Sequence, residues 1–216
     1  PQFEKERYVL SLLRSYEWAP KLIEPASGIL GLDVPGRGEV SYAFMVQSYI
    51  PFESANQFRD TTSREEILER LASIARQIHA TEFDETSGSF SQSSFSACIN
   101  VHIARLEASP IDSSMKRWLT ARLDELAEID TSPRLFHRDL LGNWGNFLVD
   151  SEGSIRGIID WEFAGSGPAF HYEVASLLYV LQRDGHSPAG ITRDLHAVLR
   201  GFHIPLATYK QDHERY

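Results

Sequence analysis

The stretch that decides the fold is LFHRDLLGNWGNFLVD, residues 135–150, which gathers a histidine, an arginine, acids and asparagines beside an apolar run. The segment SEGS follows as a turn and IRGIID as a second strand-like run, so the sequence predicts an antiparallel hairpin that turns near Gly153. Asn146 lies seven residues before that glycine and Asp160 seven residues after it. Because equidistant positions of an antiparallel hairpin are opposite each other, we expect both side chains at the same end.

The side chains at that end would offer an amide oxygen from Asn146 and a carboxylate from Asp160. Such hard oxygen donors suit Mg²⁺, which takes one or two protein oxygens together with substrate phosphates. Asp139 lies just upstream, in the loop that leads into the hairpin. A carboxylate beside a metal–phosphate pair can orient a hydroxyl group and accept its proton. His137 lies two residues earlier and can brace this loop.

The motif HRDLLGNWGNFLVD, followed by GIIDWE, resembles the catalytic loop and metal-binding segment of the aminoglycoside phosphotransferase/choline kinase family, which are protein-kinase-like kinases of small molecules. HRDL alone is also typical of protein kinases. However, IIDWEFAG stands where protein kinases carry D-F-G, and no A-P-E follows, which favours a small-molecule kinase. The resemblance implies Asp139 and His137 in the catalytic loop, with Asn146 and Asp160 as the Mg²⁺ ligands.

Further segments extend the resemblance over most of residues 3–182. EKERYVLSLL is similar to the first-lobe helix of the family, in which Glu6 takes the place of the glutamate that pairs with the nucleotide-binding lysine. YAFMVQSYIP resembles the strand and hinge that receive adenine, which implies nucleotide contacts from the backbone of Ser48 to Ile50. LASIARQIHA and GPAFHYEVASL resemble family helices. The implied co-substrate is ATP or GTP, and the implied acceptor is a hydroxyl of an aminoglycoside, a choline-like amine or another metabolite, with cationic compounds among the candidates.

Two departures from the family pattern affect these assignments. Asp139 and Asn146 are two residues further apart than the family spacing; the hairpin geometry favours Asn146 as the metal ligand, with Asn143 as the alternative. The glycine-rich hairpin and lysine strand that precede the first helix in the family have no counterpart by motif. We therefore expect either that this segment lies outside the sequence or that the chain is a natural fragment that binds nucleotide poorly.

Periodicity over the rest of the chain predicts an α+β fold. Apolar residues at helical spacing indicate a helix over 3–15 and another from Ser63, where Ser63 and Glu66 have capping-box spacing. VPGRG indicates the turn of a hairpin near 28–48. We expect a Ser-rich loop and four more helices in these places: 87–96 for the loop, and near 95–108, 113–129, 169–184 and 189–201 for the helices. The expected boundary near 49–52 divides a nucleotide-binding lobe (1–50) from a helical catalytic and acceptor-binding lobe (51–216).

The composition limits the possible partners. The 216 residues carry a net charge of −9 without a basic stripe, which disfavours nucleic acid. Cys98 is the one cysteine, which excludes a disulfide framework and a cysteine zinc site. Apolar runs such as 174–181 are too short to span a bilayer, so we expect no membrane partner and a cytoplasmic location. For Glu162 and Glu173 we expect a solvated or capping role.

Two hypotheses follow. The first is a kinase that transfers the γ-phosphoryl group of a nucleotide to a small-molecule hydroxyl. The second is a pseudokinase or truncated kinase-like protein that binds a ligand or partner; the missing lysine segment favours it, and the intact set of Asp139, Asn146 and Asp160 opposes it.

Overall fold

A computed structural model describes residues 2–59, 61, 63–84 and 134–213, together with 104, 107–108, 110, 112–117 and 120–121. Its helices and strands are α1 (Gln2–Leu12), β1 (Leu22–Val34), β2 (Gly38–Gln47), β3 (Glu53–Ser54), the 3₁₀ turn η1 (Ala55–Phe58), α2 (Arg64–His79), β4 (Arg134–Phe136), β5 (Phe147–Val149), β6 (Ile155–Ile158), the 3₁₀ turn η2 (Trp161–Phe163), β7 (Gly165–Gly167), α5 (Ala169–Arg183), α6 (Pro188–Phe202) and α7 (Leu206–His213). The predicted α+β class is confirmed.

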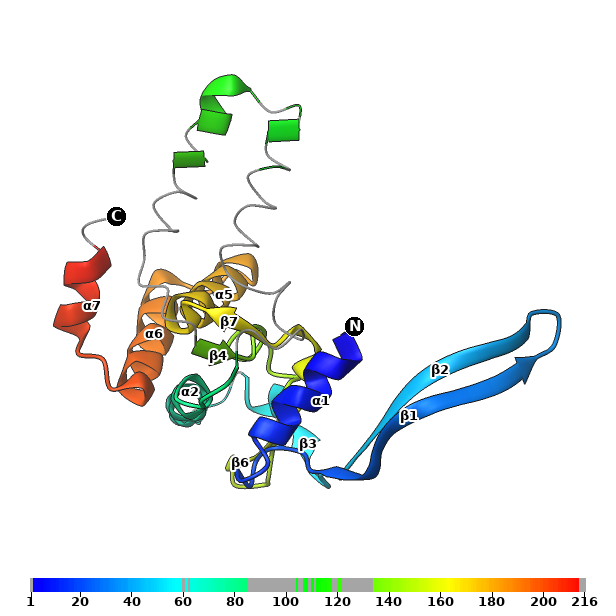
Figure 1. The fold of residues 1–216 in the computed structure, drawn as a ribbon. Helices are drawn as coiled ribbons and strands as arrows, with labels where there is room; N and C mark the ends of the chain where they lie inside the picture. The colour runs from blue at the N-terminus through cyan, green and yellow to red at the C-terminus, as the bar shows by residue number, and fades with distance from the viewer. Residues whose placement is uncertain are drawn as a thin grey trace.

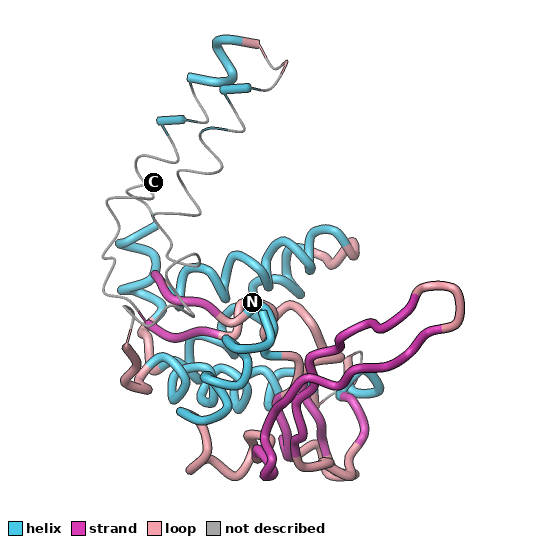
Figure 2. Tube along the Cα trace, turned by 45° about the vertical axis from the view of Figure 1, so that its right-hand side comes forward, coloured by secondary structure: helices cyan, strands magenta, loops and turns pink. Residues whose placement is uncertain are grey.

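The first hairpin, β1–β2, is a long antiparallel ribbon that projects away from the rest of the molecule (Figure 1). It pairs Val34 with Gly38 next to the turn, where Gly36 and Gly38 have φ of 79° and 74°. These backbone angles favour glycine, so VPGRG is a turn for a steric reason. In a view turned by 45° the ribbon again stands clear of the helices (Figure 2). The predicted hairpin near 28–48 is confirmed.

The first helix, α1, confirms the predicted helix over 3–15. Its buried residues Val9 and Leu10, followed by Leu13, join the main apolar core. After the helix, Trp18 stacks against Trp161 with ring centroids 6.2 Å apart, and the Trp18 carbonyl accepts a hydrogen bond from the Ile158 N–H at 2.9 Å. The N-terminal segment therefore covers the end of β6, where the predicted site begins.

The helices α2 and α6 lie against each other in the core. A Cβ atom added at Gly201 of α6 would lie 2.2 Å from the Glu69 carbonyl oxygen of α2, so only glycine permits this approach. The predicted capping box of α2 is wrong: Ser63 has helical angles (φ −80°, ψ −4°) and makes no side-chain cap, whereas a capping residue needs an extended backbone. In α6, by contrast, the Ser187 hydroxyl accepts from the Gly190 N–H at 3.2 Å.

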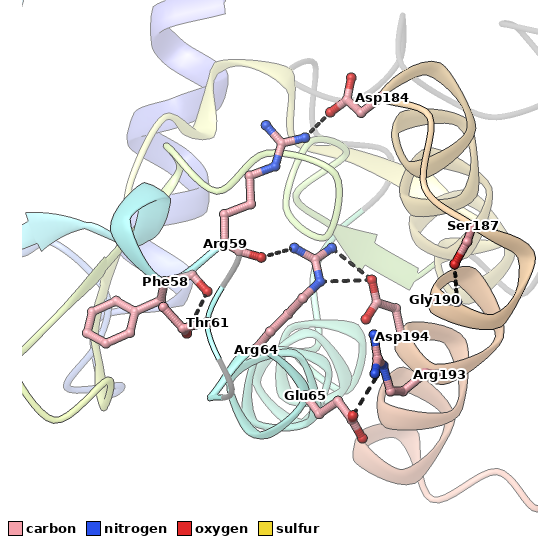
Figure 3. A network of polar contacts seen from close by, with 10 residues as sticks. All are labelled: Phe58, Arg59, Thr61, Arg64, Glu65, Asp184, Ser187, Gly190, Arg193 and Asp194. Carbon is pink, nitrogen blue, oxygen red and sulfur yellow. Dashed lines mark hydrogen bonds and ion pairs between the residues drawn. The ribbon is translucent and has the colours of Figure 1, made fainter.

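A buried ion pair fixes the beginning of α2 to α6 (Figure 3). The guanidinium of Arg64 donates to Asp194 Oδ2 from Nε at 2.9 Å, and its Nη2 lies 2.8 Å from the same oxygen. Arg64 also donates to the Arg59 carbonyl, and its guanidinium lies 4.9 Å from the centre of the Trp144 ring. Because Trp144 belongs to the stretch that decides the fold, this contact ties that stretch to the helical core.

Two small sheets hold the rest of that stretch. In one, β5 pairs with both β3 and β6; in the other, β4 pairs with β7. The helices α5 and α6 confirm the predictions near 169–184 and 189–201, whereas α7 was not predicted. The predicted loop over 87–96 lies outside the described residues, as do most of the predicted helices near 95–108 and 113–129, of which residues 113–117 are helical.

Candidate active site

His137 follows β4 and is completely buried. Its Nε2 lies 2.8 Å from the Ile159 carbonyl oxygen; since a carbonyl can only accept, Nε2 carries the proton. Its ring contacts that of Trp161, with centroids 4.6 Å apart. Burial lowers the pKa of His137, against the raising effects of the Ile159 contact, Asp139 and Asp160. The buried imidazole of His137 therefore joins the loop to the end of the hairpin.

Asp139 stands at the centre of a hydrogen-bonded cluster. Its Oδ2 accepts from Asn143 Nδ2 at 2.9 Å and from Asn146 Nδ2 at 3.1 Å. The backbone carbonyl of Asp139 also accepts from Asn146 Nδ2, at 2.8 Å. Two amides therefore fix the orientation of one carboxylate.

The two asparagines differ in what their carbonyl oxygens do. Asn143 Oδ1 accepts from the Gly145 N–H at 3.0 Å and so closes a local turn. Both bonds of the Asn146 side chain use Nδ2. Oδ1 of Asn146 is therefore the better placed oxygen for a metal ion, which agrees with the hairpin argument for Asn146 over Asn143.

The predicted hairpin is confirmed, with a register one residue different from the expected one. Phe147 pairs with Ile158, and the Ile159 N–H donates to the Asn146 carbonyl at 2.9 Å. Next to the turn Val149 pairs with Ile155, so the turn is centred on Glu152 and not on Gly153; the irregularity between Leu148 and Val149 then moves the pairing one residue back towards the expected register. Asp160 therefore lies one residue beyond Ile159, the partner of Asn146, and at the same end of the hairpin as Asn146, as predicted.

The backbone of Asp160 is left-handed, with φ 65° and ψ 58°, and the residue is exposed. Asp and Asn tolerate this conformation better than most residues, and strained angles of this kind gather at functional sites. Trp161 anchors the chain directly after it, because its buried ring donates from Nε1 to the Ile158 carbonyl at 3.0 Å. The exposed carboxylate thus stands on a rigid base.

Glu6 reaches the same place from α1, which lies against η2. Its pKa is raised chiefly by burial and also by Asp160 and Glu162, against the lowering effect of a hydrogen bond from the Trp161 N–H. No lysine is among the groups that shift its pKa. The structure therefore brings Glu6 beside the metal-binding candidate Asp160.

Ser48 and Ile50 lie in the connection between β2 and β3. The Ser48 N–H donates to the Lys21 carbonyl at 2.7 Å, and the Ile50 carbonyl accepts from the Phe52 N–H at 2.8 Å. The Ile50 side chain covers β6, since a Cβ at Gly157 would lie 2.7 Å from its Cδ1. This connection therefore runs beside the site hairpin, and two of its backbone groups are already hydrogen-bonded.

Glu173 of α5 contacts the loop around Asp139 from a buried position that the sequence reasoning missed. The expected solvated or capping role is wrong, because the side chain is fully buried. Its Oε1 accepts from the Arg138 N–H at 3.3 Å and its Oε2 from the Leu141 N–H at 3.5 Å. The pKa of Glu173 is raised to about 7, chiefly by burial and to a smaller extent by the charge of Asp139. Hydrogen bonds from the loop backbone act in the opposite direction and lower the pKa.

The signal for Glu173 was present in the sequence. Glu173 stands four residues after Ala169 and four before Leu177, and both of these residues are buried. Helical spacing therefore placed this carboxylate on the inner face of α5, where a charged group needs partners. Those partners are the backbone N–H groups of the loop that carries Asp139.

The loop also holds a strained residue and a close approach. Arg138 has a φ of 83°, and its guanidinium lies 5.4 Å from the centre of the Tyr172 ring. A Cβ at Gly142 would lie 2.8 Å from Ser176 Oγ and 3.2 Å from Val180 Cγ2. Gly142 therefore allows the loop to lie directly on α5.

A pocket of about 630 Å³ opens beside Asp139. The outer face of α5, between Tyr172 and Arg183, forms one wall, and Phe163 of η2 and Arg138 of the loop also line it. The geometry thus combines an oriented carboxylate, two side chains with oxygen atoms at one end of a hairpin, and a pocket large enough for a small molecule.

Solved structures with the same fold are small-molecule phosphotransferases. The type VIII aminoglycoside-3'-phosphotransferase has 23% sequence identity and a TM-score of 0.54 over 94% of this chain and 73% of that one. Aminoglycoside phosphotransferase APH(3'')-Id from Streptomyces rimosus, in complex with ADP and streptomycin, has 16% identity and a TM-score of 0.59 over 95% and 76%. Macrolide 2'-phosphotransferase MphH from Brachybacterium faecium has 16% identity and a TM-score of 0.54 over 95% and 67%.

These likenesses confirm the predicted kinase-like fold. A sequence model of the Phosphotransferase enzyme family (APH) matches residues 1–210, and the chain belongs to this family. The predicted enzyme class, a phosphotransferase, is thereby confirmed. No curated protein matches the chain significantly. Within the described part of the chain, none of the helices has the length and apolar character needed to cross a membrane.

Proposed function

We propose that this protein transfers the γ-phosphoryl group of ATP or GTP to a hydroxyl group of a small molecule. The observation that carries the proposal is the placement of Asp139, whose carboxylate is fixed by Asn143 and Asn146 and lines the pocket. A carboxylate held at the edge of such a pocket can meet the hydroxyl of a bound acceptor.

Asp139 is the proposed base. It orients the acceptor hydroxyl and accepts its proton as the oxygen attacks the γ-phosphorus, while the bond between that phosphorus and the bridging oxygen breaks. Glu173 acts through the loop, because it receives the Arg138 and Leu141 N–H groups and so fixes the backbone on both sides of Asp139. His137 fixes the loop from the opposite side, through Ile159.

Asn146 and Asp160 are the proposed Mg²⁺ ligands. Both residues offer a hard oxygen atom, and both lie at the same end of the hairpin. The side-chain hydrogen bonds of Asn146 use Nδ2 and leave Oδ1 for a metal ion, and the Asp160 carboxylate is exposed. A bound Mg²⁺ would neutralise charge on the nucleotide phosphates. Among the described residues no group of three or more His, Cys, Asp or Glu side chains could hold a metal, and a two-ligand site suits Mg²⁺ that also binds phosphates.

The nucleotide would lie between Glu6, the connection from Ser48 to Ile50, and the site hairpin. The proposal is supported by solved relatives described as ADP-bound and GDP-bound, so both ATP and GTP are candidates. We also propose the division into a nucleotide-binding part, 1–50, and a catalytic and acceptor-binding part, 51–216. The second hypothesis, a non-catalytic binding protein, receives no support from the family or from the assembled site.

Replacement of Asp139 by Asn tests the proposal. Asp139→Asn keeps the size of the side chain but removes the base, so the rate of transfer should fall by about 10²–10⁴. Nucleotide affinity should change little, since Asp139 acts on the acceptor. Both are measured on the full-length protein, with labelled nucleotide and a panel of hydroxylated acceptors.

Glu152→Gln is the matched control for this substitution. It makes the same chemical change at an exposed residue in the turn of the hairpin, away from the site, and should leave both quantities unchanged. Transfer by Asp139→Asn at the rate of the unchanged protein would remove Asp139 from its role. A collapse of nucleotide affinity would instead assign Asp139 to the metal site and reopen Asn143 as a ligand.

A further inference from the structure

The pocket beside Asp139 has a distinctive charge. Two of the residues that line it, Arg138 and Arg183, are cationic, and Asp139 is its one acid among the described residues. The carboxylate of Asp139 already accepts two amide donors, and its proposed task is to receive a hydroxyl. From the described residues, an acceptor in this pocket therefore faces more positive than negative charge.

Arg183 remains available to a ligand although it is paired. Its Nε donates to Asp184 Oδ1 at 2.9 Å, while 57% of its side chain is exposed. Since this bond uses Nε, the two terminal nitrogens form the part of the guanidinium that can bind an oxyanion in a bidentate manner.

The acid next to Arg183 does not neutralise this rim. Asp184 is shared, because its other oxygen is paired with Arg59 (Figure 3). Two guanidinium groups thus meet one carboxylate, and a net positive charge remains. A polycationic ligand would be repelled here, whereas a carboxylate or phosphate ester would be attracted.

The same pocket is aromatic. Tyr172, Tyr179 and Phe163 line it, and the last two are 65% and 46% exposed, high for large apolar side chains. Exposed rings at the edge of a pocket provide faces on which a planar or apolar part of a ligand can stack. The pocket therefore offers three things together: a base for a hydroxyl, aromatic surface, and a cationic edge.

We propose that the acceptor is a hydroxylated compound with an anionic group, bound by Arg183, and an apolar or aromatic part, and that polycationic aminosugars are poor ligands. This inference rests on the proposed function, because it takes the pocket at Asp139 as the acceptor site. It selects against the cationic acceptors that the sequence had left among the candidates.

Three matched probes test the proposal: phenyl β-glucuronide (anionic), phenyl β-glucoside (neutral) and phenyl 2-amino-2-deoxy-β-glucoside (cationic). Binding to the full-length protein is measured by calorimetry, and phosphoryl transfer with labelled ATP and GTP. We expect the glucuronide to bind about 10-fold or more tightly than the glucoside, since a hydrogen bond to a charged group contributes at least that factor, and the amino compound to bind most weakly.

Arg183→Gln should remove the preference for the glucuronide and leave the affinity for the neutral glucoside unchanged. Arg156→Gln is the control, because Arg156 is a similarly exposed arginine whose Nε donates to an aspartate, Asp150, at 2.8 Å, on the site hairpin outside the pocket. This variant should retain the full preference.

The outcomes separate the two proposals. Equal or tighter binding of the amino compound, no binding of any probe, or an unchanged preference in Arg183→Gln overturns the inference about charge. Phosphoryl transfer to the amino compound alone would also overturn the inference about charge, but it would support the proposed function. The expected preference without transfer to any probe supports the charge selectivity of the pocket and counts against the proposed function.

Discussion

The two hairpins of this protein are built on the same local principle and have opposite surroundings. The β1–β2 ribbon is long, yet Ile29 and Leu30 in it are 77% and 49% exposed. The β5–β6 hairpin has strands of three and four residues, yet Phe147 in it is completely buried. The long ribbon is held mainly by its own ladder (Figure 1), whereas the short one is paired with β3 and covered by Trp161.

The difference teaches that the rigidity of a site on a hairpin depends on how far the hairpin is buried, and not on the length of its strands. Asn146 and Asp160 flank strands too short to be stable alone, and the core around them supplies the rigidity. Catalysis by positioning needs that rigidity, because small displacements of the reacting groups cost large factors in rate. A long but uncovered ribbon cannot supply it.

The sharpest test of this contrast is at Asp160. Asp160→Ala removes a proposed Mg²⁺ ligand and should lower Mg²⁺-dependent transfer by about 10³-fold or more, because metal charge contributes several kcal/mol to such reactions. The fold should survive, since the side chain is exposed. Asp160→Asn serves as a companion because asparagine tolerates the left-handed backbone of this residue. Circular dichroism and transfer assays check both variants, and turnover at the unchanged rate in Asp160→Ala would take Asp160 out of the site.

A pair of truncations compares the stabilities of the two hairpins. Phe147→Ala leaves a cavity in the core and should lower the free energy of unfolding by about 3–5 kcal/mol. Phe44→Ala in β2, where the side chain is 36% exposed, should cost less than about 1 kcal/mol. Urea denaturation of both variants measures the difference. Equal losses would mean that the ribbon is as much a part of the cooperative core as the site hairpin.

The pH dependence of stability tests the loop support behind the hairpin. Burial raises the pKa of Glu173 from 4.5 to about 7, so folding favours its protonated form. Stability from this residue is therefore fully present below pH 4.5 and is lost as the pH rises to about 7. Glu173→Gln lacks this titration, so relative to the variant the unchanged protein should lose about 3 kcal/mol across that window.

Denaturation at pH 4.5 and pH 7.5 measures this loss. Glu152→Gln, at the exposed turn, is the control and should follow the unchanged protein at both values. A difference between Glu173→Gln and the unchanged protein that stays constant with pH would show that Glu173 does not titrate with folding.

The smallest expected effect concerns backbone strain in the loop. Arg138 has a φ of 83°, which costs a residue with a Cβ about 1–2 kcal/mol relative to glycine. Arg138→Gly and Arg138→Ala both remove the guanidinium, and only the alanine keeps the strain. The glycine variant should therefore be the more stable by about 1 kcal/mol in thermal or urea unfolding, and equal stabilities would show that the loop relaxes around this residue.

Local signals were sufficient for much of this architecture. The turn residues of VPGRG and SEGS predicted both hairpins because turn geometry is set by a few adjacent residues. Helical spacing predicted α1, α2, α5 and α6, because the positions of their apolar residues define the face of each helix that is buried. The capping box at Ser63 failed because the backbone there is helical, which spacing alone does not reveal.

The site was only partly predictable. Asp139, Asn146 and Asp160 could be placed near one another from hairpin symmetry, and the roles assigned to them stay predictions. The register differs from the expected one by one residue, because the pairing of Val149 with Ile155 centres the turn on Glu152 and the irregularity at Leu148 and Val149 restores only part of the difference; the turn residues did not indicate either feature. Glu173 was assigned a solvated or capping role since an acid in a helix is usually solvated, and only its spacing from Ala169 and Leu177 indicated burial.

The sequence by itself determined the turns, the helices and the order of the polar groups, because these depend on interactions between residues close together in the chain. Only the tertiary structure decided which of these groups meet. It placed Glu6 beside Asp160, the backbone of the loop that carries Asp139 on Glu173, and Arg183 at the edge of the pocket of Asp139. These contacts between residues far apart in the sequence depend on how the helices pack and on how much water the packing excludes. Exclusion of water, which no single segment can achieve, gives a carboxylate such as Glu173 its altered pKa.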